Sequence, residues 1–557
     1  MTVRPTSPMP GRRYLAYGVL TLLAACANLP TSLNPGKQDG AGATTTAASP
    51  SLTSLVNSAV DIPEVQAVGV IPPPPPHTWV DDKEDVNENR ASNYGLVSIP
   101  VMEEYLNKLY KKAKQLADVP DWPGKVYISS DTSINAHSSA AGNIYINIAV
   151  LQSAESEDEM FAVITHEFGH IYLNHQAAYR SKQMTGTAVF FGRAAVAVAT
   201  KNLGGASWNA GDTLNVAGSL TDNVMIPTWQ RSVEEQADRF GVTLSLKGGY
   251  SYPAGFKTFL ERLALVERKY NLKVAAEQKA VADQKTAKDL QTQQARWDVK
   301  WSEAMRNSVN ESSAKAISAL GQGGADTKNH DDAEIREKTL TDEVRALPKA
   351  PRARVQSAPW KEVTKNRSVA EVLAHFGFLP KIEELAQAHR LPEAIKLANV
   401  MASGATESDG TANITLSNLL HEENRLPLDA QIAVLLRTQN SPQRSWAAQV
   451  LAAKWMATTN PAQAKLFIEK QFEYFEKAPR TVPDMIGFYI ESLKSPLLAA
   501  SLNIPCMASN PRYRQACIDR SLTDAERQTN KAKNEARTEA LGKNLGNKRG
   551  KAFGLDK

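Results

Sequence analysis

The sequence predicts an α+β fold that is mostly helical, with a small β-sheet in its first half and an all-helical region in its second half. Two segments, 125–128 and 143–148, alternate apolar and polar residues as strands do. Apolar residues recur at helical spacing in 101–117 and 254–270, and beyond 369 single prolines separate short helical segments. With 557 residues, 42% of them hydrophobic, the chain can build more than one domain around a sizeable core.

The N-terminus has the pattern of an export signal. Three arginines precede an apolar segment, residues 14–25, that is too short to span a bilayer. The segment ends in Leu-Ala-Ala before Cys26, which resembles the lipobox of bacterial lipoproteins, in which the cysteine is acylated. We expect residues 1–25 to be a lipoprotein signal peptide. An ordinary signal peptide with an incidental cysteine is the alternative.

The resemblance to lipoproteins also implies a location. Ala27 and Asn28 follow the cysteine, in place of the Asp that marks retention at the inner membrane. An outer-membrane anchor that faces the periplasm is therefore expected.

A low-complexity tether is expected over residues 26–95. This region is rich in Ala, Thr, Ser, Gly and Pro, and Pro72–Pro76 is an unbroken proline run. Such a composition buries too little apolar surface to offset the conformational entropy lost on folding. The tether would set the distance between the membrane and the folded part.

The first folded domain is expected over residues 96–347. Its helix at 101–117 and its two strands precede an acidic turn, 155–159, which suits a helix N-terminus and leads into an apolar helix. A Lys/Gln/Ala-rich insertion at about 273–320 has few large apolar residues. We interpret this insertion as a solvated helical arm or a partly disordered segment rather than an arm that binds a partner.

The second half of the chain is expected to be helical. Residues 348–366 contain prolines and basic residues and resemble a linker, and 367–522 resemble a helical, repeat-like domain without a steady period of about 34 residues. Residues 523–557 carry nine Lys/Arg against five Asp/Glu, which is typical of a basic disordered tail. The net charge is only +5, and we expect no nucleic-acid partner.

The cysteines agree with export. The chain has three, and two of them, Cys506 and Cys517, enclose ten residues. In an oxidising periplasm a disulfide between them would stabilise the fold by about 2–3 kcal/mol. Two buried free thiols are the alternative.

The strongest chemical motif is the pentapeptide His166–His170, sequence HEFGH, inside an apolar helical run. Residues four apart share one face of a helix, so both imidazoles can bind one metal ion while Glu167 points toward the same opening. A catalytic zinc needs a third protein ligand and an open position. Carboxylates for that role are available on a second helical segment, at Glu234 and Glu235.

Two alternatives are less favoured by the spacing. Metzincins require a glycine three residues after the second histidine and a further histidine three residues later, where this chain has Leu173 and Gln176. His175 lies five residues after His170, off the ligand face, and we expect it to be structural.

The motif, followed about sixty residues later by Glu-x-x-Ala-Asp, resembles the HtpX-like zinc metallopeptidase family, which includes the CAAX prenyl endopeptidase and the BepA-type proteases. The resemblance implies a gluzincin-type metalloprotease domain with one Zn²⁺ per chain, bound by His166, His170 and Glu234. Glu235, about 100° around the helix from Glu234, would face elsewhere. Asp238 would hydrogen-bond a ligand histidine and fix its tautomer.

The resemblance covers residues 97–347 and implies a substrate-binding strand. In such proteases the strand before the metal helix is an edge strand that pairs with extended substrate, which corresponds here to Asn143, Ile144 and Tyr145. Main-chain hydrogen bonds of this kind hold a peptide without demanding one sequence.

A later block of the family corresponds to His330 and Arg336, with Asp331 in place of the usual proline. His330 would stabilise the oxyanion of the tetrahedral intermediate, or it would occupy the open metal position and hold the enzyme latent. An unrelated loop histidine is the third interpretation.

Together these features predict a membrane-anchored periplasmic zinc metalloendopeptidase that hydrolyses unfolded, stalled or misassembled envelope proteins. Zinc would activate a water molecule, and Glu167 would accept its proton and deliver it to the leaving amine. The helical domain would dock onto outer-membrane assembly machinery. A chaperone or assembly scaffold with little proteolytic activity is the alternative, although an intact Glu167 argues against a silenced site.

Overall fold

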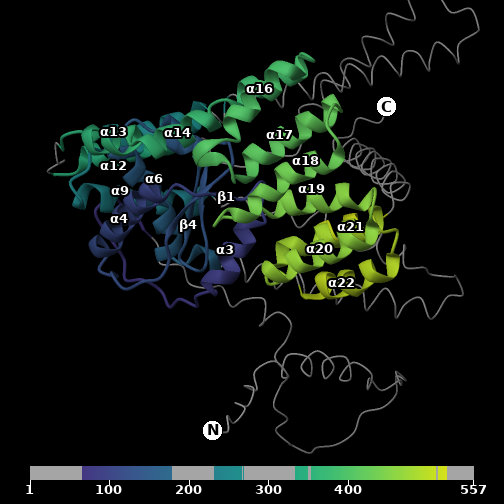
Figure 1. Ribbon diagram of the computed structural model, residues 1–557. Coiled ribbons are helices and arrows are strands. Elements are labelled where there is room, and N and C mark those ends of the chain that lie inside the picture. The colour runs from purple at the N-terminus through teal and green to yellow at the C-terminus, as the bar shows by residue number, and fades with distance from the viewer. Residues whose placement is uncertain are drawn as a thin grey trace, which may run out of the picture. The chain divides into compact units, whose positions relative to one another are not determined.

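The computed structural model describes residues 65–177, 231–265, 268, 333–348, 353–509 and 512–522 (Figure 1). Several predictions concern residues outside these ranges. They are the signal peptide, lipidation of Cys26, the insertion at 273–320, the role of His330 and the tail at 523–557.

The sheet has four short strands in the order β1-β2-β4-β3. They are β1 (Leu96–Val97), β2 (Val126–Ser129), β3 (Ala136–Ser138) and β4 (Ile144–Asn147). Strands β2 and β4 are parallel, whereas β1 pairs with β2 and β3 pairs with β4 in antiparallel fashion. The antiparallel strands β1 and β3 therefore lie at the two edges of the sheet, on either side of the parallel pair of β2 and β4.

The prediction that 143–145 form an edge strand is wrong. Strand β4 pairs with β2 on one side and with β3 on the other, and Asn143, Ile144 and Tyr145 are fully buried. Both faces of β4 are covered, so the apolar run that marks it in the sequence belongs to a central strand rather than to an exposed one.

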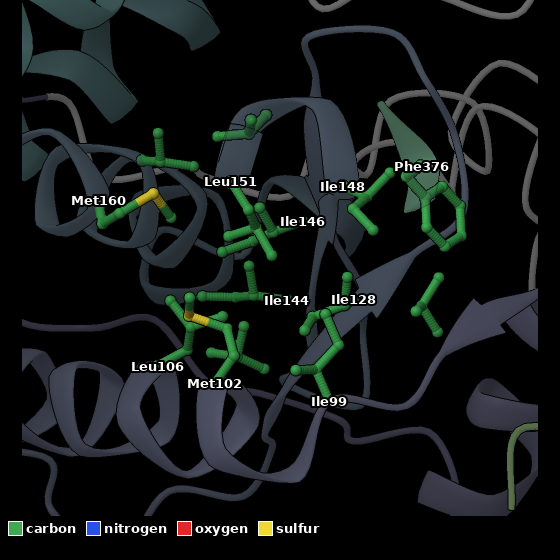
Figure 2. Packing of buried hydrophobic residues seen from close by; sticks show 14 of the residues in the cluster. Ile99, Met102, Leu106, Ile128, Ile144, Ile146, Ile148, Leu151, Met160 and Phe376 are labelled. Carbon is green, nitrogen blue, oxygen red and sulfur yellow. The ribbon is translucent and has the colours of Figure 1, made fainter. Parts of the chain in front are cut away.

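Helices α4 (Pro100–Leu116), α5 (Ile148–Ser153) and α6 (Glu157–Tyr172) pack against the sheet. Figure 2 shows Met102 and Leu106 of α4 and Met160 of α6 pointing toward Ile144 and Ile146 of β4. All five side chains are fully buried. This core fixes the position of α6, the helix that carries the HEFGH motif.

Helix α6 begins as its sequence predicts. The side chain of its N-cap, Ser156, accepts a hydrogen bond from the Glu159 N–H, and three acidic residues fill the first turn, where the helix dipole favours negative charge. The helix is buried almost throughout and packs against α9 (Arg231–Lys247), seen beside it in Figure 1. The motif therefore lies on an internal helix rather than on a surface helix.

The folded part begins earlier than the expected tether boundary at residue 95. Residues 82–90 form helix α3 (Asp82–Arg90), with Asp81 as its N-cap. The Asp85 carboxylate accepts hydrogen bonds from Ser139 Oγ, Asn143 Nδ2 and Tyr145 Oη at 2.8, 2.9 and 2.6 Å. Hydrogen bonds to the sheet, together with the burial of a single apolar side chain, Val86, attach this polar helix, and for that reason composition did not reveal it.

The expected linker at 348–366 is also wrong in part, because residues 357–365 form helix α13 (Ser357–Lys365). Trp360 is buried, and its indole N–H donates to the Ala154 carbonyl at 2.8 Å. Upstream of α13 lies α12 (Ala333–Ala346), which packs against α9 and against the short π-helix η1 (Pro253–Lys257).

Residues 367–522 are helical, as predicted. Several of the prolines that separate the segments lie in the first turn of a helix, where their missing N–H costs nothing. The helices are α14 (Arg367–Phe376), α15 (Leu379–Gln387), α16 (Leu391–Met401), α17 (Gly410–Glu423), α18 (Leu428–Leu436), α19 (Trp446–Ala457), α20 (Pro461–Tyr474), α21 (Val482–Glu491), α22 (Pro496–Ser509) and α23 (Arg514–Ser521).

Helices that follow one another in this region also pack against one another, from α15 with α16 through α19 with α20 and α21 with α22. The predicted disulfide is present, and Cys506 and Cys517 join α22 to α23. A small sheet combined with predominantly helical structure confirms the predicted fold class. Within the described ranges, no helix is both long enough and apolar enough to cross a bilayer.

Candidate metal centre

Helices α6 and α9 approach each other closely because glycines lie at their contact. A Cβ atom on Gly169 would lie 3.0 Å from Ala237 Cα, and a Cβ atom on Gly241 would lie 3.0 Å from the backbone nitrogen of His166. Any larger side chain would push the helices apart. The two glycines thus let the first turn of α9 face the HEFGH segment.

Three side chains from these two helices converge. His166 Nε2 lies 3.3 Å from His170 Nε2, and the two Glu234 oxygens lie 3.5 Å from these nitrogens, one from each. A tetrahedral zinc site with metal–ligand bonds of about 2.1 Å has ligand atoms about 3.4 Å apart. All three residues are buried, and one ligand atom from each lies within 4.8 Å of the other two. The donor set therefore fits a zinc ion.

A buried ion-pair network surrounds the ligands. His166 Nδ1 lies 2.9 Å from Asp238 Oδ1, and Arg336 from α12 binds the same carboxylate through Nε and Nη2 at 2.7 and 2.8 Å. The third guanidinium nitrogen, Nη1, lies 3.1 Å from Glu234 Oε2. Because Nδ1 of His166 faces Asp238, Nε2 is the nitrogen that faces the metal position, and a proton on Nε2 would leave when a metal binds.

The network makes this position favourable for a cation. Burial lowers the pKa of His166, but hydrogen bonds to Asp238 and Glu234 outweigh burial and raise it to about 10. Burial also opposes ionisation of Glu234, yet the hydrogen bond from His166 and the charge of Arg336 hold its pKa well below the usual range. Burial lowers the pKa of His170 to about 4 and keeps that ring neutral. An ionised carboxylate and a neutral imidazole are the forms that bind zinc.

Glu167 is the candidate base. It is buried on α6 beside the ligands, and burial raises its pKa to about 7, while the charge of His166 and a hydrogen bond from the Ser138 hydroxyl act in the opposite direction. A carboxylate whose pKa lies close to the working pH can accept and release a proton within one catalytic cycle.

Strand β3 lies next to this carboxylate, as the Ser138 contact shows. His137 pairs with Tyr145, and the hydrogen bonds Ser139 N–H to Asn143 O and Asn147 N–H to Asn135 O flank that pair. Alternation along an antiparallel pair then directs the main-chain groups of Ala136 and Ser138 away from β4.

This outer edge of β3 is the one suited to an extended peptide. Among the described residues, no strand pairs with it, although the Ser138 carbonyl accepts a hydrogen bond from Gln176 Nε2 at 2.8 Å and the Ala136 N–H donates to Asn135 Oδ1 at 2.9 Å. Sequence reasoning chose β4 instead because its apolar alternation is stronger than the signal of a three-residue Ala-His-Ser strand.

Most of the predicted site residues come together in the structure. They are His166, Glu167, His170, Glu234, Asp238 and Arg336. Glu235, the competing ligand, is directed instead toward Arg239, with 3.8 Å between Oε2 and Nη1. Sequence reasoning missed one contact to the ligands, that of His175 with His170, because His175 follows the end of the helix and does not share its periodicity.

Comparison with known proteins matches one region of the chain to a family model. Residues 100–296 match the model of peptidase family M48. The chain carries a peptidase family M48 domain. The HEFGH motif of this M48 domain and its Glu-x-x-Ala-Asp segment both lie inside the matched residues.

Named relatives match part of this chain. A putative beta-barrel assembly-enhancing protease of Vibrio cholerae serotype O1 is 28% identical over 177 residues, 31% of this chain and 35% of the relative. The beta-barrel assembly-enhancing protease of Escherichia coli strain K12 is 28% identical over 171 residues, 30% of this chain and 34% of its own length. The metalloprotease LoiP of the same strain is 30% identical over 171 residues, 30% of this chain and 63% of LoiP. The chain thus spans about a third of the length of the first two relatives.

Proposed function

We propose that the protein is a zinc-dependent endopeptidase that cleaves extended segments of unfolded polypeptides. The observation that carries this proposal is the set of three buried ligand side chains, with contacts of 3.3–3.5 Å between their nitrogen and oxygen atoms, beside a buried carboxylate. A purely structural zinc site normally has four protein ligands and no adjacent base. Three ligands with Glu167 beside them fit a hydrolytic site better.

The mechanism assigns one task to each group. Zinc, when bound, supplies Lewis-acid chemistry: it polarises the scissile carbonyl and lowers the pKa of water. Glu167 accepts a proton from the attacking water and passes it to the leaving amine. Asp238 holds His166 in the tautomer that leaves Nε2 unprotonated, and Arg336 keeps Asp238 and Glu234 ionised.

Substrate binding is assigned to the outer edge of β3 in place of β4. A peptide that adds a strand beside Ala136–Ser138 passes next to Glu167, which accepts a hydrogen bond from Ser138. Recognition through main-chain hydrogen bonds suits an enzyme that must accept many sequences. His330, outside the described residues, keeps its two proposed roles in oxyanion stabilisation or latency.

The cellular location is inferred from the N-terminal segment and the disulfide, and the substrates are inferred from the relatives. The lipobox-like Cys26 supports a lipid-anchored, periplasmic location with the outer membrane favoured, and the Cys506–Cys517 disulfide suits an oxidising compartment. Two of the relatives carry names that refer to beta-barrel assembly. We therefore propose misassembled envelope proteins as substrates, and outer-membrane assembly machinery as the partner of the helical domain.

Cleavage of unfolded casein by the full-length protein, with and without a chelator, tests this proposal. The wild-type protein should cleave casein, and a chelator should abolish cleavage. Glu167→Gln should retain zinc and lose at least about a thousandfold in rate, because both proton transfers depend on this carboxylate. Full activity of E167Q would contradict the mechanism. Failure of the wild-type protein to show chelator-sensitive cleavage would favour the scaffold alternative.

A further inference from the structure

The chain turns sharply at the end of α6 and brings a third histidine to the metal centre. Leu173 is the C-cap of the helix, and Asn174 has φ +54°, in the left-handed region where asparagine is one of the few tolerated residues. The next residue, His175, lies against the ring of His170 and is fully buried. Its position results from this turn rather than from helical periodicity.

The two rings meet through defined atoms. His170 Nδ1 lies 3.0 Å from His175 Nδ1, with the ring planes at 70° to each other. One of these two nitrogens must carry the hydrogen and the other must accept it.

The metal site decides which nitrogen donates. The Nε2 atom of His170 faces Glu234 at 3.5 Å and His166 Nε2 at 3.3 Å, so this nitrogen must keep its lone pair for the metal. The hydrogen of His170 then lies on Nδ1 and points at His175. It follows that His175 accepts through Nδ1 and carries its own hydrogen on Nε2.

We propose that His175 is a positioning residue of the metal centre, which orients His170 and fixes its tautomer by accepting the Nδ1 hydrogen. The inference rests on the proposed zinc site and extends it. Asp238 does the same for His166 through a 2.9 Å contact. A neutral acceptor on His170, in place of a second carboxylate, leaves the charge of the centre unchanged.

The N-terminal segment of the described chain holds the turn in place. We call residues 72–77 the proline strap. Asn174 Nδ2 donates to the Pro76 carbonyl at 2.8 Å, and the Tyr172 hydroxyl donates to the Pro72 carbonyl at 2.9 Å. His77 Nε2 lies 2.7 Å from the Ile171 carbonyl. The strap thus contacts residues 171, 172 and 174, directly before His175, and restricts where the ring can lie.

Two substitutions of similar size separate an acceptor role from simple space filling. Asn places its Oδ1 where the Nδ1 of histidine lies. Leu has a branched shape similar to that of Asn but carries no hydrogen-bond acceptor. We expect His175→Leu to weaken zinc binding by about 10- to 100-fold and His175→Asn to bind within about threefold of the wild type. His421→Leu, in the helical domain, is the control for loss of a histidine.

Competition with a chromophoric chelator gives the zinc dissociation constant of each full-length protein. Zinc affinity of H175L within twofold of wild type would overturn the inference, and so would equal losses in H175L and H175N. If the wild-type protein itself binds no zinc, the proposed function fails instead. The two failures are therefore distinguishable.

A measurement on the zinc-loaded wild-type protein covers the case in which H175L does not fold. Nitrogen-15 spectra of selectively labelled histidines should show His175 as the neutral tautomer protonated on Nε2, and His170 protonated on Nδ1. The H175N protein assigns the His175 signals. A hydrogen on His175 Nδ1 would overturn the inference.

Discussion

At the scale of single residues, two glutamates of the same site have pKa values that are shifted in opposite directions. Glu167 is buried with few compensating contacts, and its pKa rises to about 7, whereas Glu234 is buried against His166 and Arg336 and stays ionised. Environments that push two carboxyl pKa values apart are how one site obtains both a metal ligand and a proton carrier.

The pH dependence of cleavage follows from Glu167. A general base works only when ionised, so activity should fall as the pH drops through its pKa. Burial places that pKa at about 7, and the charge of a zinc ion pulls it lower, so the acid limb should lie between 4.5 and 7. Measurement of kcat/KM from pH 4 to 9 checks this limb. A rate that stays constant over this range would show that Glu167 is not the base.

Removal of Arg336 should destabilise the fold, because this side chain compensates the charges of two buried carboxylates. Arg336→Met leaves Asp238 and Glu234 buried without their guanidinium partner, which should lower the free energy of unfolding by about 3–5 kcal/mol. The matched control is Arg345→Met on the same helix, where the side chain is 76% exposed and a change within about 0.5 kcal/mol is expected. Urea unfolding in the presence of a chelator measures both variants, and equal losses would contradict the network's role.

At the scale of elements, the site depends on the contact of α6 with α9 and on the outer strand β3. The first places three ligands on two helices, and the second offers main-chain groups beside Glu167. Neither element suffices alone, because the base lies between the metal ligands and the strand.

The edge of β3 can be tested by removing one donor. Ala136→Pro deletes an outward N–H without affecting the pairing of His137 with Tyr145, since an edge strand tolerates proline where its N–H faces away from the sheet. We expect KM for an unfolded substrate to rise about tenfold, with zinc affinity unchanged. Ala136→Val, which keeps the N–H, is the control, and an unchanged KM for A136P would rule out β3 as the docking edge.

The parts that the sequence could predict are those encoded by local periodicity. The HEFGH face follows from residues four apart on one helix, and the helical second half follows from proline-separated segments. Glu234 and Arg336 come from elements distant in sequence, so only family resemblance could select them. Helix α3 escaped prediction because polar contacts through Asp85 attach it to the sheet. Composition records apolar burial and not such contacts.

At the scale of the whole described chain, α3 connects the sheet to the helical second half. On one side Asp85 binds β4, and on the other Glu88 accepts a hydrogen bond from the Arg480 N–H at 2.8 Å, while Arg90 Nε donates to Gln443 Oε1 at 2.9 Å. The segment expected to be a loose tether therefore joins the two halves.

Zinc content is the measurement that tests the central claim most directly. The wild-type protein, loaded with zinc and desalted, should contain about one zinc per chain, and so should Glu235→Gln, which alters the carboxylate beside the ligand. Glu234→Gln should lose most of the metal under the same conditions, because it removes one of three ligands. Full zinc content in E234Q, or loss of zinc in E235Q, would contradict the metal centre described for α6 and α9.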